Sequence, residues 1–520
     1  MYYLTQSLHR NAQIAGNKLS TIYLNRQRTW VETKDRVARL AGALHSLDIK
    51  PDDRVAILAL NSDRYLEYYF ATWWAGAAVV PMNVRWSVAE NAYSLRDSGA
   101  EVLLVDDVFA KMVPAIRPEC PALKHVVFTG EGTLPEGMLD YETLVASAQS
   151  VDDAYRHDKQ LAGIFYTGGT TGFPKGAMLT HQSMLSSAYA VGMEMKANAD
   201  CRYLHAAPMF HLADGAGSNA ISIVGAAHVM VPMFTPDGVL NIIQTHRVTH
   251  SVLVPTMIKM IIDLPTFGQY DVSSMKTILY GASPIAESTL IEAMQKFPNT
   301  QFMQGYGQTE LSPIVTILPA EYHVLEGEKA GKLRSAGRAT YCAQVTVRDE
   351  DGNEVPQGHI GEIAVKGPNM MLGYWNKPEE SAKVLKGGWL YTGDGGYMDA
   401  DGFVFIVDRM KDMIVTGGEN VYSTEVENAL MAHPAVSQAV VIGIPSDEWG
   451  EAVHAFVILR PDVQTIENEL IEHCKSLIAN YKCPRSITFR NEPFPLSGAG
   501  KILKRELRAP FWEGKTRMVN

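Results

Sequence analysis

Glycines and threonines surround a single lysine in the segment FYTGGTTGFPKGAMLTH, residues 165–181. The residues concerned are Thr167, Gly168, Gly169, Thr170, Thr171, Gly172 and Lys175. Glycines let the backbone approach a phosphate closely, while hydroxyl and backbone N–H groups donate hydrogen bonds to it. The pattern predicts a loop that binds a polyphosphate, with Lys175 supplying positive charge. Taken alone, it is equally compatible with an exposed loop that carries a surface lysine.

The order of these residues disfavours a Walker A loop. That loop requires G-x-x-x-x-G-K-[ST], with the lysine directly after the last glycine. Here Lys175 follows Pro174 and precedes Gly176. The later segment SGAGKILK also fails, because Pro495 and Ile502 occupy the first glycine position and the hydroxyl position. A P-loop NTPase is therefore disfavoured.

The order [YF]-T-x-G-T-T-G-x-P-K-G resembles the phosphate-loop signature of the adenylate-forming superfamily. This superfamily includes acyl-CoA synthetases, aryl-CoA ligases, peptide-synthetase adenylation domains and firefly luciferase. Further segments resemble its motifs in the same order: APMFH (207–211), LYGASP (279–284), QGYGQTE (304–310), WLYTGDGGYMDADGFVFIVDR (389–409), RMKDMIVTGGENVYSTEVE (409–427) and PLSGAGKILKREL (495–507). GEIAVKGPNMMLGYW (361–375) resembles a structural stretch to which we assign no chemistry. The resemblance spans nearly the whole chain.

The resemblance implies a site for ATP and Mg²⁺. It makes Tyr306 the residue that stacks on adenine, Thr309 a contact of the α-phosphate and Glu310 the metal ligand. Asp394 would accept the ribose hydroxyls, and Arg409 would contact ribose or phosphate. The same motifs add Gly281, Ala282, Ser283, Gly305 and Gly307 to the nucleotide site.

The resemblance also implies a reaction in two steps. A carboxylate attacks the α-phosphorus of ATP with release of pyrophosphate, and a thiolate, here that of CoA, then displaces AMP. Such chemistry needs orientation and charge stabilisation rather than a nucleophilic side chain. Lys501 matches the catalytic lysine, Lys411 the hinge of a mobile C-terminal domain, and Gly417 and Gly418 the path of the CoA thiol.

The pocket for the acid is implied at His211, Ala213, Gly215, Gly281 and Gly305. Some fatty acyl-CoA synthetases carry a gating tryptophan four residues after the histidine, where this chain has Gly215. No cationic residue stands out for a second carboxylate, so we expect a largely apolar monocarboxylic acid.

We rank a medium- or long-chain fatty acid first and an aryl acid of the coumarate, ferulate or benzoate type second. Loading of a carrier protein is the third alternative, and a luciferase-like oxygenase is also allowed. The non-enzyme alternative is a nucleotide-binding sensor.

The elements that position these motifs alternate between strands and helices. Apolar segments at 53–60, 77–82 and 101–107 are typical of strands, and the segments at 63–75 and 87–99 are typical of helices. Alternation of this kind predicts βαβ units and parallel sheets. The fold class expected for the N-terminal part is therefore α/β, with several subdomains.

The last part of the chain predicts a small α+β domain. Thr424 and Glu427 suggest a capping box that opens a helix ending near His433. Strands at 438–445 and 452–460, a helix near 466–478 and a strand at 486–489 follow. We expect an AMP- and acid-binding domain at 1–408 and a mobile domain at 409–520. Lys504 and Arg505 are expected to be solvated.

The composition limits the classes of partner and the cellular location that we expect. The net charge of −11 argues against nucleic acid and anionic membranes as partners. The longest apolar stretch, 216–234, is interrupted by polar residues, so no integral membrane segment is expected. There is no secretory signal pattern, and five scattered cysteines suggest reduced thiols. We expect a cytoplasmic protein, with a homodimer as one allowed assembly.

Overall fold

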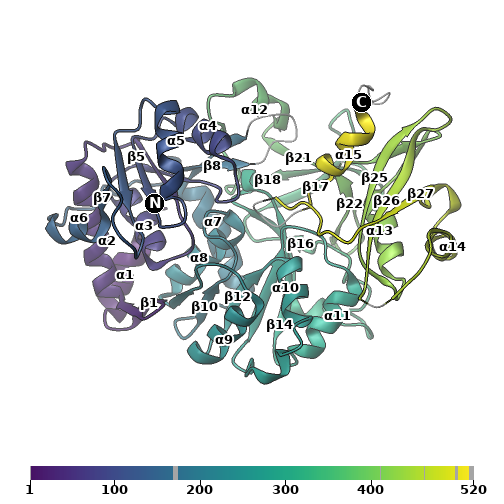
Figure 1. The fold of residues 1–520 in the computed structure, drawn as a ribbon, viewed down its shortest axis with the longest axis horizontal. Coiled ribbons are helices and arrows are strands. Elements are labelled where there is room, and N and C mark those ends of the chain that lie inside the picture. The colour runs from purple at the N-terminus through teal and green to yellow at the C-terminus, as the bar shows by residue number, and fades with distance from the viewer. Residues whose placement is uncertain (1, 168–173, 410–411, 462, 498–501, 514–520) are drawn as a thin grey trace.

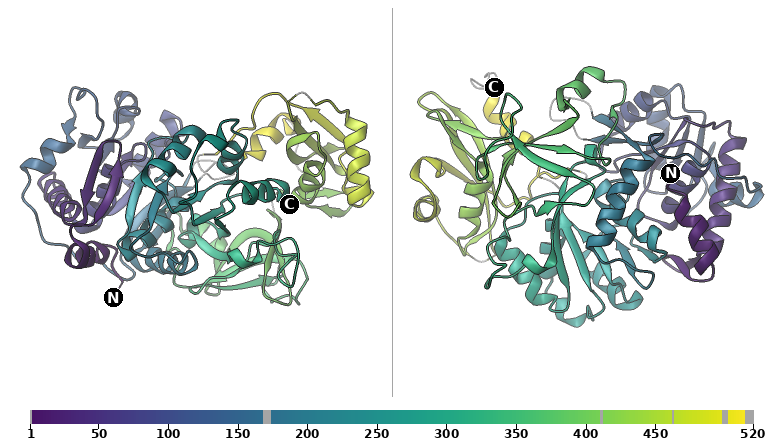
Figure 2. Two further views of the ribbon diagram at one scale, coloured as in Figure 1. Left: turned by 90° about the horizontal axis from the view of Figure 1, so that it is seen from below. Right: turned by 180° about the vertical axis from the view of Figure 1, so that it is seen from behind.

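The computed structural model describes residues 2–167, 174–409, 412–461, 463–497 and 502–513. Within these ranges the chain forms four β-sheets. Figures 1 and 2 show the N-terminal residues at one end of the molecule and the C-terminal unit at the other. In the described part, no helix is long and apolar enough to cross a membrane.

An eight-stranded sheet carries the strands on both sides of residues 168–173. In spatial order its strands are β19 (Gly373–Tyr374), β9 (Lys175–Thr180), β8 (Leu161–Thr167), β4 (Ala78–Pro81), β3 (Arg54–Leu58), β5 (Val102–Val105), β6 (His125–Phe128) and β7 (Leu139–Asp140). The strands from β8 to β7 pair in parallel, while β9 and β19 pair antiparallel at one edge. The helices that connect or follow these strands are α3 (Asp63–Trp74), α4 (Val88–Ser98), α5 (Val113–Ile116), α6 (Tyr141–Ser147) and α7 (His181–Glu194).

A nine-stranded sheet carries the adenine and acid motifs. Its order is β16 (Arg338–Ala339), β15 (Ile314–Leu318), β14 (Gln301–Gly307), β13 (Thr277–Gly281), β12 (His250–Leu253), β10 (Arg202–His205), β11 (Ala227–Met230), β1 (Leu19–Tyr23) and β2 (Arg26–Thr29). The inner strands are parallel, with antiparallel pairs at both edges. Its helices are α1 (Gln6–Ala15), α2 (Trp30–Ser46), α8 (Leu212–Val224), α9 (Pro236–His246), α10 (Pro255–Ile262) and α11 (Glu287–Lys296).

A smaller antiparallel sheet follows and positions the ribose motif. It contains β17 (Gln344–Arg348), β18 (Gly361–Lys366), β21 (Trp389–Met398), β20 (Leu385–Lys386) and β22 (Val404–Arg409). The helix α12 (Pro378–Val384) lies between β19 and β20 in the chain.

The C-terminal unit has its own sheet and its own apolar core. The sheet comprises β24 (Glu419–Val421), β23 (Ile414–Thr416), β26 (Gly450–Leu459), β25 (Val436–Ser446) and β27 (Ser486–Phe489). The helices are α13 (Ser423–Met431), α14 (Glu467–Leu477) and α15 (Lys504–Trp512). Buried residues from α13, α14 and the strands, among them Val426, Val441 and Leu470, form the core. The expected combination of an α/β body with a small α+β unit is confirmed.

Helix α3 is buried along its whole length, although it carries charged residues. Asp63 pairs with Arg26 at 2.8 Å, and Glu67 pairs with Arg36 at 2.7 Å. Charges survive burial when they are paired and hydrogen-bonded in this way. The opposite side of the helix is aromatic, and it contributes Tyr69 and Trp73 to a cavity described below.

Two details of the C-terminal unit differ from expectation. Helix α13 begins at Ser423 after Tyr422 and has no side-chain cap, so the capping box of Thr424 and Glu427 is wrong. Glu427 instead pairs with Lys504 at 2.7 Å, and Lys504 is therefore not simply solvated. The helix pattern could not reveal this, because the two residues are brought together only when α15 packs near α13.

Candidate functional site

The C-terminal ends of parallel strands bring the acid and adenine motifs together. Strands β12, β13 and β14 run parallel, with Gly281 beside Gly305 at their ends. A Cβ atom on Gly281 would lie 2.1 Å from the carbonyl oxygen of Gly305, so only glycine fits there. Ala282 follows with φ of +66°. Ligands of α/β sheets bind at this edge of the strands.

A buried carboxylate connects the adenine motif to the ribose motif. The hydroxyl of Tyr306 on β14 donates to Oδ2 of Asp394 on β21 at 2.7 Å, and Nε of Arg409 pairs with Oδ1 at 2.7 Å. Asp394 and Arg409 face each other across the β21–β22 hairpin. Burial and the charge of Asp394 raise the pKa of Tyr306 well above its ordinary value, so its hydroxyl stays a donor.

A second cluster connects the predicted phosphate lysine to the predicted metal ligand. Thr309 and Glu310 lie in a short 3₁₀ helix after β14, and Glu310 Oε1 accepts a hydrogen bond of 2.8 Å from Tyr374. Nζ of Lys175 lies 4.4 Å from the centroid of the Tyr374 ring and 3.6 Å from a carboxylate oxygen of Glu380. Tyr374 therefore contacts both the ammonium group of Lys175 and the carboxylate of Glu310.

Thr167 and Lys175 are paired across the β8–β9 hairpin. The predicted residues Gly168, Gly169, Thr170, Thr171 and Gly172 lie outside the described residues, as do Lys411 and Lys501. On the N-terminal side of residue 498, the carbonyl oxygen of Ser497 accepts a hydrogen bond of 3.0 Å from Arg85. The C-terminal unit thus contacts the N-terminal body just before the segment that contains Lys501.

Three of the predicted acid-pocket residues, His211, Ala213 and Gly215, lie at the start of helix α8. His211 is its N-cap, and Nδ1 of the imidazole accepts a hydrogen bond of 3.1 Å from the N–H of Ala213. Gly215 has open space on its Cβ side apart from Leu212 at 3.2 Å. Ser283 lies in the loop that follows β13, and Gly307 is the last residue of β14, near the same strand ends.

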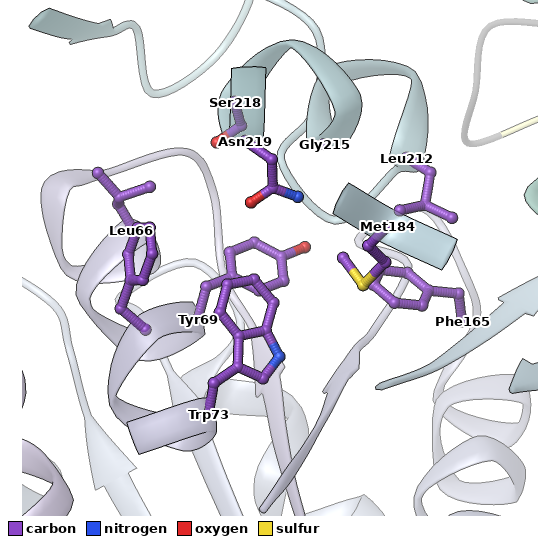
Figure 3. A pocket seen from close by; sticks show the side chains of 10 residues that line it. Leu66, Tyr69, Trp73, Phe165, Met184, Leu212, Gly215, Ser218 and Asn219 are labelled. Carbon is purple, nitrogen blue, oxygen red and sulfur yellow. The ribbon is translucent and has the colours of Figure 1, made fainter. Parts of the chain in front are cut away.

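A cavity of about 10 Å³ lies between α3, α7 and α8 (Figure 3). Its lining includes Tyr69, Trp73, Phe165, Met184, Gly215 and Asn219. Figure 3 shows the amide of Asn219 facing the rings of Tyr69 and Trp73. Asn219 is 8% exposed, and its side chain has no hydrogen-bond partner among the described residues. The cavity is thus aromatic with one available amide.

Gly417 and Gly418 form the turn between β23 and β24. Both have positive φ, +60° and +84°, as a two-residue hairpin of type I′ requires. The N–H of Gly417 donates to the carbonyl oxygen of Trp449 at 2.9 Å, and a Cβ on Gly417 would lie 2.9 Å from the Trp449 ring. Trp449 therefore packs against Gly417, one of the two glycines predicted to line the path of the CoA thiol.

Sequence reasoning missed Tyr374 and Trp449. Tyr374 lies in the segment to which no chemistry was assigned, and its contacts with Lys175 and Glu310 come from distant segments. The only signal available was the place of Tyr374 in a conserved-looking stretch between two motifs. These contacts form because β19 pairs with β9.

We predict that Tyr374→Phe weakens the response to Mg²⁺. The substitution keeps the ring beside Lys175 but removes the hydroxyl that orients Glu310. The Mg²⁺ concentration that gives half-maximal pyrophosphate release should rise about tenfold, at the lower end of the effects seen for outer-shell ligands. Tyr397→Phe, on β21 and stacked on Phe405, is the control. An unchanged Mg²⁺ dependence in Tyr374→Phe would show that the hydroxyl does not orient Glu310.

Comparison with known proteins identifies the family. A family model described as AMP-binding enzyme matches residues 8–375, and one described as AMP-binding enzyme C-terminal domain matches residues 425–501. A feruloyl-CoA synthase from Amycolatopsis sp is 38% identical over 484 residues, covering 93% of this chain and 94% of the relative.

Two further relatives differ in the acid that their names state. The medium/long-chain-fatty-acid–CoA ligase FadD8 of Mycobacterium tuberculosis is 36% identical over 500 residues, covering 93% of this chain and 86% of the relative. The crystal structure of the anthranilate CoA ligase AuaEII in complex with anthranoyl-AMP superposes with a TM-score of 0.92 and 28% identity, covering 99% and 98% of the two chains. The chain belongs to the AMP-binding enzyme family of the adenylate-forming superfamily, and it is an AMP-forming acid–thiol ligase.

Proposed function

We propose that this protein converts a monocarboxylic acid to its CoA thioester through an acyl adenylate. The carboxylate attacks the α-phosphorus of ATP, and the bond to pyrophosphate breaks. The CoA thiolate then attacks the acyl carbon, and AMP leaves. The observation that carries the proposal is the meeting of two clusters, Asp394 with Tyr306 and Arg409, and Glu310 with Tyr374 and Lys175, around the end of β14.

The nucleotide would lie along the ends of β13 and β14. A carboxylate has about four acceptor positions, and Asp394 uses two of them for Tyr306 and Arg409. The remaining positions are available to the two ribose hydroxyls. The Tyr306 ring, held through its hydroxyl, would stack on adenine, with Gly281, Ala282 and Ser283 beside it. Thr309 would contact the α-phosphate, and Lys175 with Thr167 the β- and γ-phosphates.

Glu310 fits the requirements of a magnesium ligand. Its Oε1 accepts from Tyr374, while Oε2 accepts no hydrogen bond from the described residues. Those residues hold no group of three or more side chains that could bind a metal. Mg²⁺ is commonly held by one or two carboxylates together with substrate phosphates. When bound, it would neutralise phosphate charge as pyrophosphate leaves.

The C-terminal unit would serve both steps. Arg85 of the N-terminal body donates a hydrogen bond to Ser497, four residues before Lys501 in the sequence. This contact supports a first step in which Lys501 would stabilise the reacting carboxylate and α-phosphate. In the second step, rotation about Lys411 would withdraw Lys501 and present Gly417 and Gly418 to the thiol. One scaffold would thereby support two reactions. The division at residues 408 and 409 is part of this proposal.

Two classes of acid compete for the pocket formed by His211, Ala213, Gly215, Gly281 and Gly305. Relatives named for feruloyl-CoA and for medium- or long-chain fatty acids are of similar identity. The space behind Gly215 is about 10 Å³ and is closed by Tyr69, Trp73 and Met184. Sites for drug-sized ligands usually measure about 300–1,000 Å³. A long acyl chain could not extend into this space while its lining stays in place, so we favour a compact aryl acid, and the Asn219 amide at this wall could bind a polar ring substituent.

A panel of acids tests the function. Fatty acids of increasing length, cinnamates, benzoates and anthranilate would be supplied with ATP, Mg²⁺ and CoA, and AMP, pyrophosphate and thioester would be measured. We expect acid-dependent pyrophosphate release and a CoA thioester, with a hydroxylated aryl acid preferred over a long-chain fatty acid. Thioester formed only on a carrier protein would redirect the proposal to loading, and ATP binding without pyrophosphate release to a sensor.

Lys501→Ala should separate the two steps. We expect it to reduce acyl-adenylate formation by at least about a hundredfold, because charge at the α-phosphate loses its counter-charge. Thioester formation from supplied acyl adenylate should stay near the wild-type rate. Arg505→Ala, four residues along the chain, is the control. An equal fall in both half-reactions would contradict the role of Lys501.

Met184→Ala should shift the preference toward longer acids. Met184 lines the cavity behind Gly215 and is 2% exposed, so its truncation extends that space. We expect the kcat/KM ratio between an acid two carbons longer and its parent to rise about tenfold, because an added methylene is worth about 1–3 kcal/mol in such pockets. Met257→Ala on α10, also buried, should lower the Tm without changing this ratio. A ratio that changes equally in both variants would mean that the acid does not reach the cavity.

A further inference from the structure

A chain of buried polar side chains fastens α8 to the nine-stranded sheet. Oδ2 of Asp214 lies 2.6 Å from Nδ1 of His205 on β10, and Nε2 of His205 lies 2.9 Å from Nδ1 of His228 on β11. Nε2 of His228 lies 3.0 Å from the hydroxyl of Ser222, which is again on α8. The hydroxyl of Tyr203 donates to Oδ1 of Asp214 at 3.1 Å. This hydrogen-bonded network therefore begins at Asp214 in the first turn of α8, crosses β10 and β11, and ends at Ser222 in the last turn of α8.

All five side chains belong to residues that are at most 1% exposed. The neighbours of Asp214 from other elements are Tyr203 and His205 on β10 and Tyr69 on α3, whose pKa is raised by burial and by the charge of Asp214. A polar network at this depth is costly unless every member is satisfied. Replacing a buried ion pair by apolar residues is often neutral or stabilising, so stability alone does not explain it.

Counting donors fixes the direction of each hydrogen bond. Ser222 donates its single proton to the carbonyl oxygen of Ser218 at 3.0 Å, so it must accept from Nε2–H of His228. Burial lowers the pKa of His228 well below its ordinary value, which leaves Nδ1 of its neutral ring as an acceptor. His205 must then donate through Nε2–H. Its Nδ1 and Oδ2 of Asp214 then share one further proton across the 2.6 Å contact.

One end of the hydrogen-bonded network, Asp214, lies between two residues of the proposed acid pocket. Asp214 lies between Ala213 and Gly215 in the first turn of α8. The N–H of Ala213 also holds the imidazole of His211, so the same turn sets the orientation of that ring. A shift of this turn would move His211, Ala213 and Gly215 together. It would leave Asp394, Arg409 and Tyr306 in place, because those lie on other strands.

We propose that Asp214 is a positioning residue for the carboxylic acid, acting through the first turn of α8, which the Asp214–His205–His228–Ser222 chain fastens to the sheet. The proposal rests on the proposed function. According to the proposal, the hydrogen-bonded network affects the binding of the acid and does not affect the binding of ATP.

The test compares Asp214→Ala with Asp214→Asn. An asparagine can accept from Tyr203 through Oδ1 and donate to Nδ1 of a neutral His205, which leaves the rest of the chain satisfied. We expect Asp214→Ala to raise the KM for the acid about tenfold or more, since small displacements of positioning groups cost up to about a hundredfold. The KM for ATP should stay within about twofold, and Asp214→Asn should stay close to wild type.

Two further variants complete the design. Ser222→Ala removes the acceptor at the other end of the chain and should raise the KM for the acid in the same direction as Asp214→Ala. It also keeps the test available if Asp214→Ala does not fold. Asp153→Ala is the matched control, because Asp153 is 7% exposed and forms an equivalent pair with His9 at 2.9 Å, away from the first turn of α8. We expect it to lower the Tm without changing the KM for the acid.

Three results would overturn the proposal: a parallel rise in the KM values for acid and ATP, an Asp214→Asn variant as impaired as Asp214→Ala, or an acid KM unchanged in both Asp214→Ala and Ser222→Ala.

Hydrogen exchange gives a readout that does not need activity. Amides in the first turn of α8 should lose protection in Asp214→Ala and keep it in Asp214→Asn. If no acid supports pyrophosphate release by the wild type, the proposed function fails, while this exchange result still decides whether Asp214 holds the turn.

Discussion

The buried carboxylate of Asp394 is the interaction on which the candidate site depends. It binds the hydroxyl of Tyr306, 88 residues earlier in the chain, and the guanidinium of Arg409 across a hairpin. Asp394 is 4% exposed, so neither partner could be removed without leaving a charge poorly compensated. The nine-stranded sheet and the smaller antiparallel sheet therefore keep a fixed relation at the point where the nucleotide would bind.

Other parts of the site are organised around this junction by steric and polar constraints. The approach of Gly281 to Gly305 leaves no room for a side chain at the strand ends. Tyr374 contacts both Glu310, through a hydrogen bond from its hydroxyl, and Lys175 of the eight-stranded sheet, through its ring. Helix α8 is held to the sheet by the buried network of Asp214, His205, His228 and Ser222, and its first turn would face the acid. Each substrate group would thus meet side chains from a different sheet.

The sequence predicted the α/β class, the small C-terminal unit and a strand within residues 101–107, which the structure has at Val102–Val105. These predictions succeeded because they depend on local periodicity and on short motifs. The capping box at Thr424 and the solvated Lys504 were wrong, because a partner from α15 changes the environment of Glu427. The same limitation hid Tyr374 and Trp449, since no local pattern marks a residue whose partners are distant in sequence.

The sequence by itself determined the family and the types of side chain present for each chemical step, because glycines, hydroxyls, carboxylates and lysines stand in fixed motif order. The tertiary structure decided which of them meet. Asp394 joins Tyr306 and Arg409, Tyr374 joins Lys175 and Glu310, and Asp214 joins His205 and His228 only because strands and helices from separate segments pack side by side. Hydrogen bonds and ion pairs act over a few ångströms in space, whereas a motif records only distance along the chain.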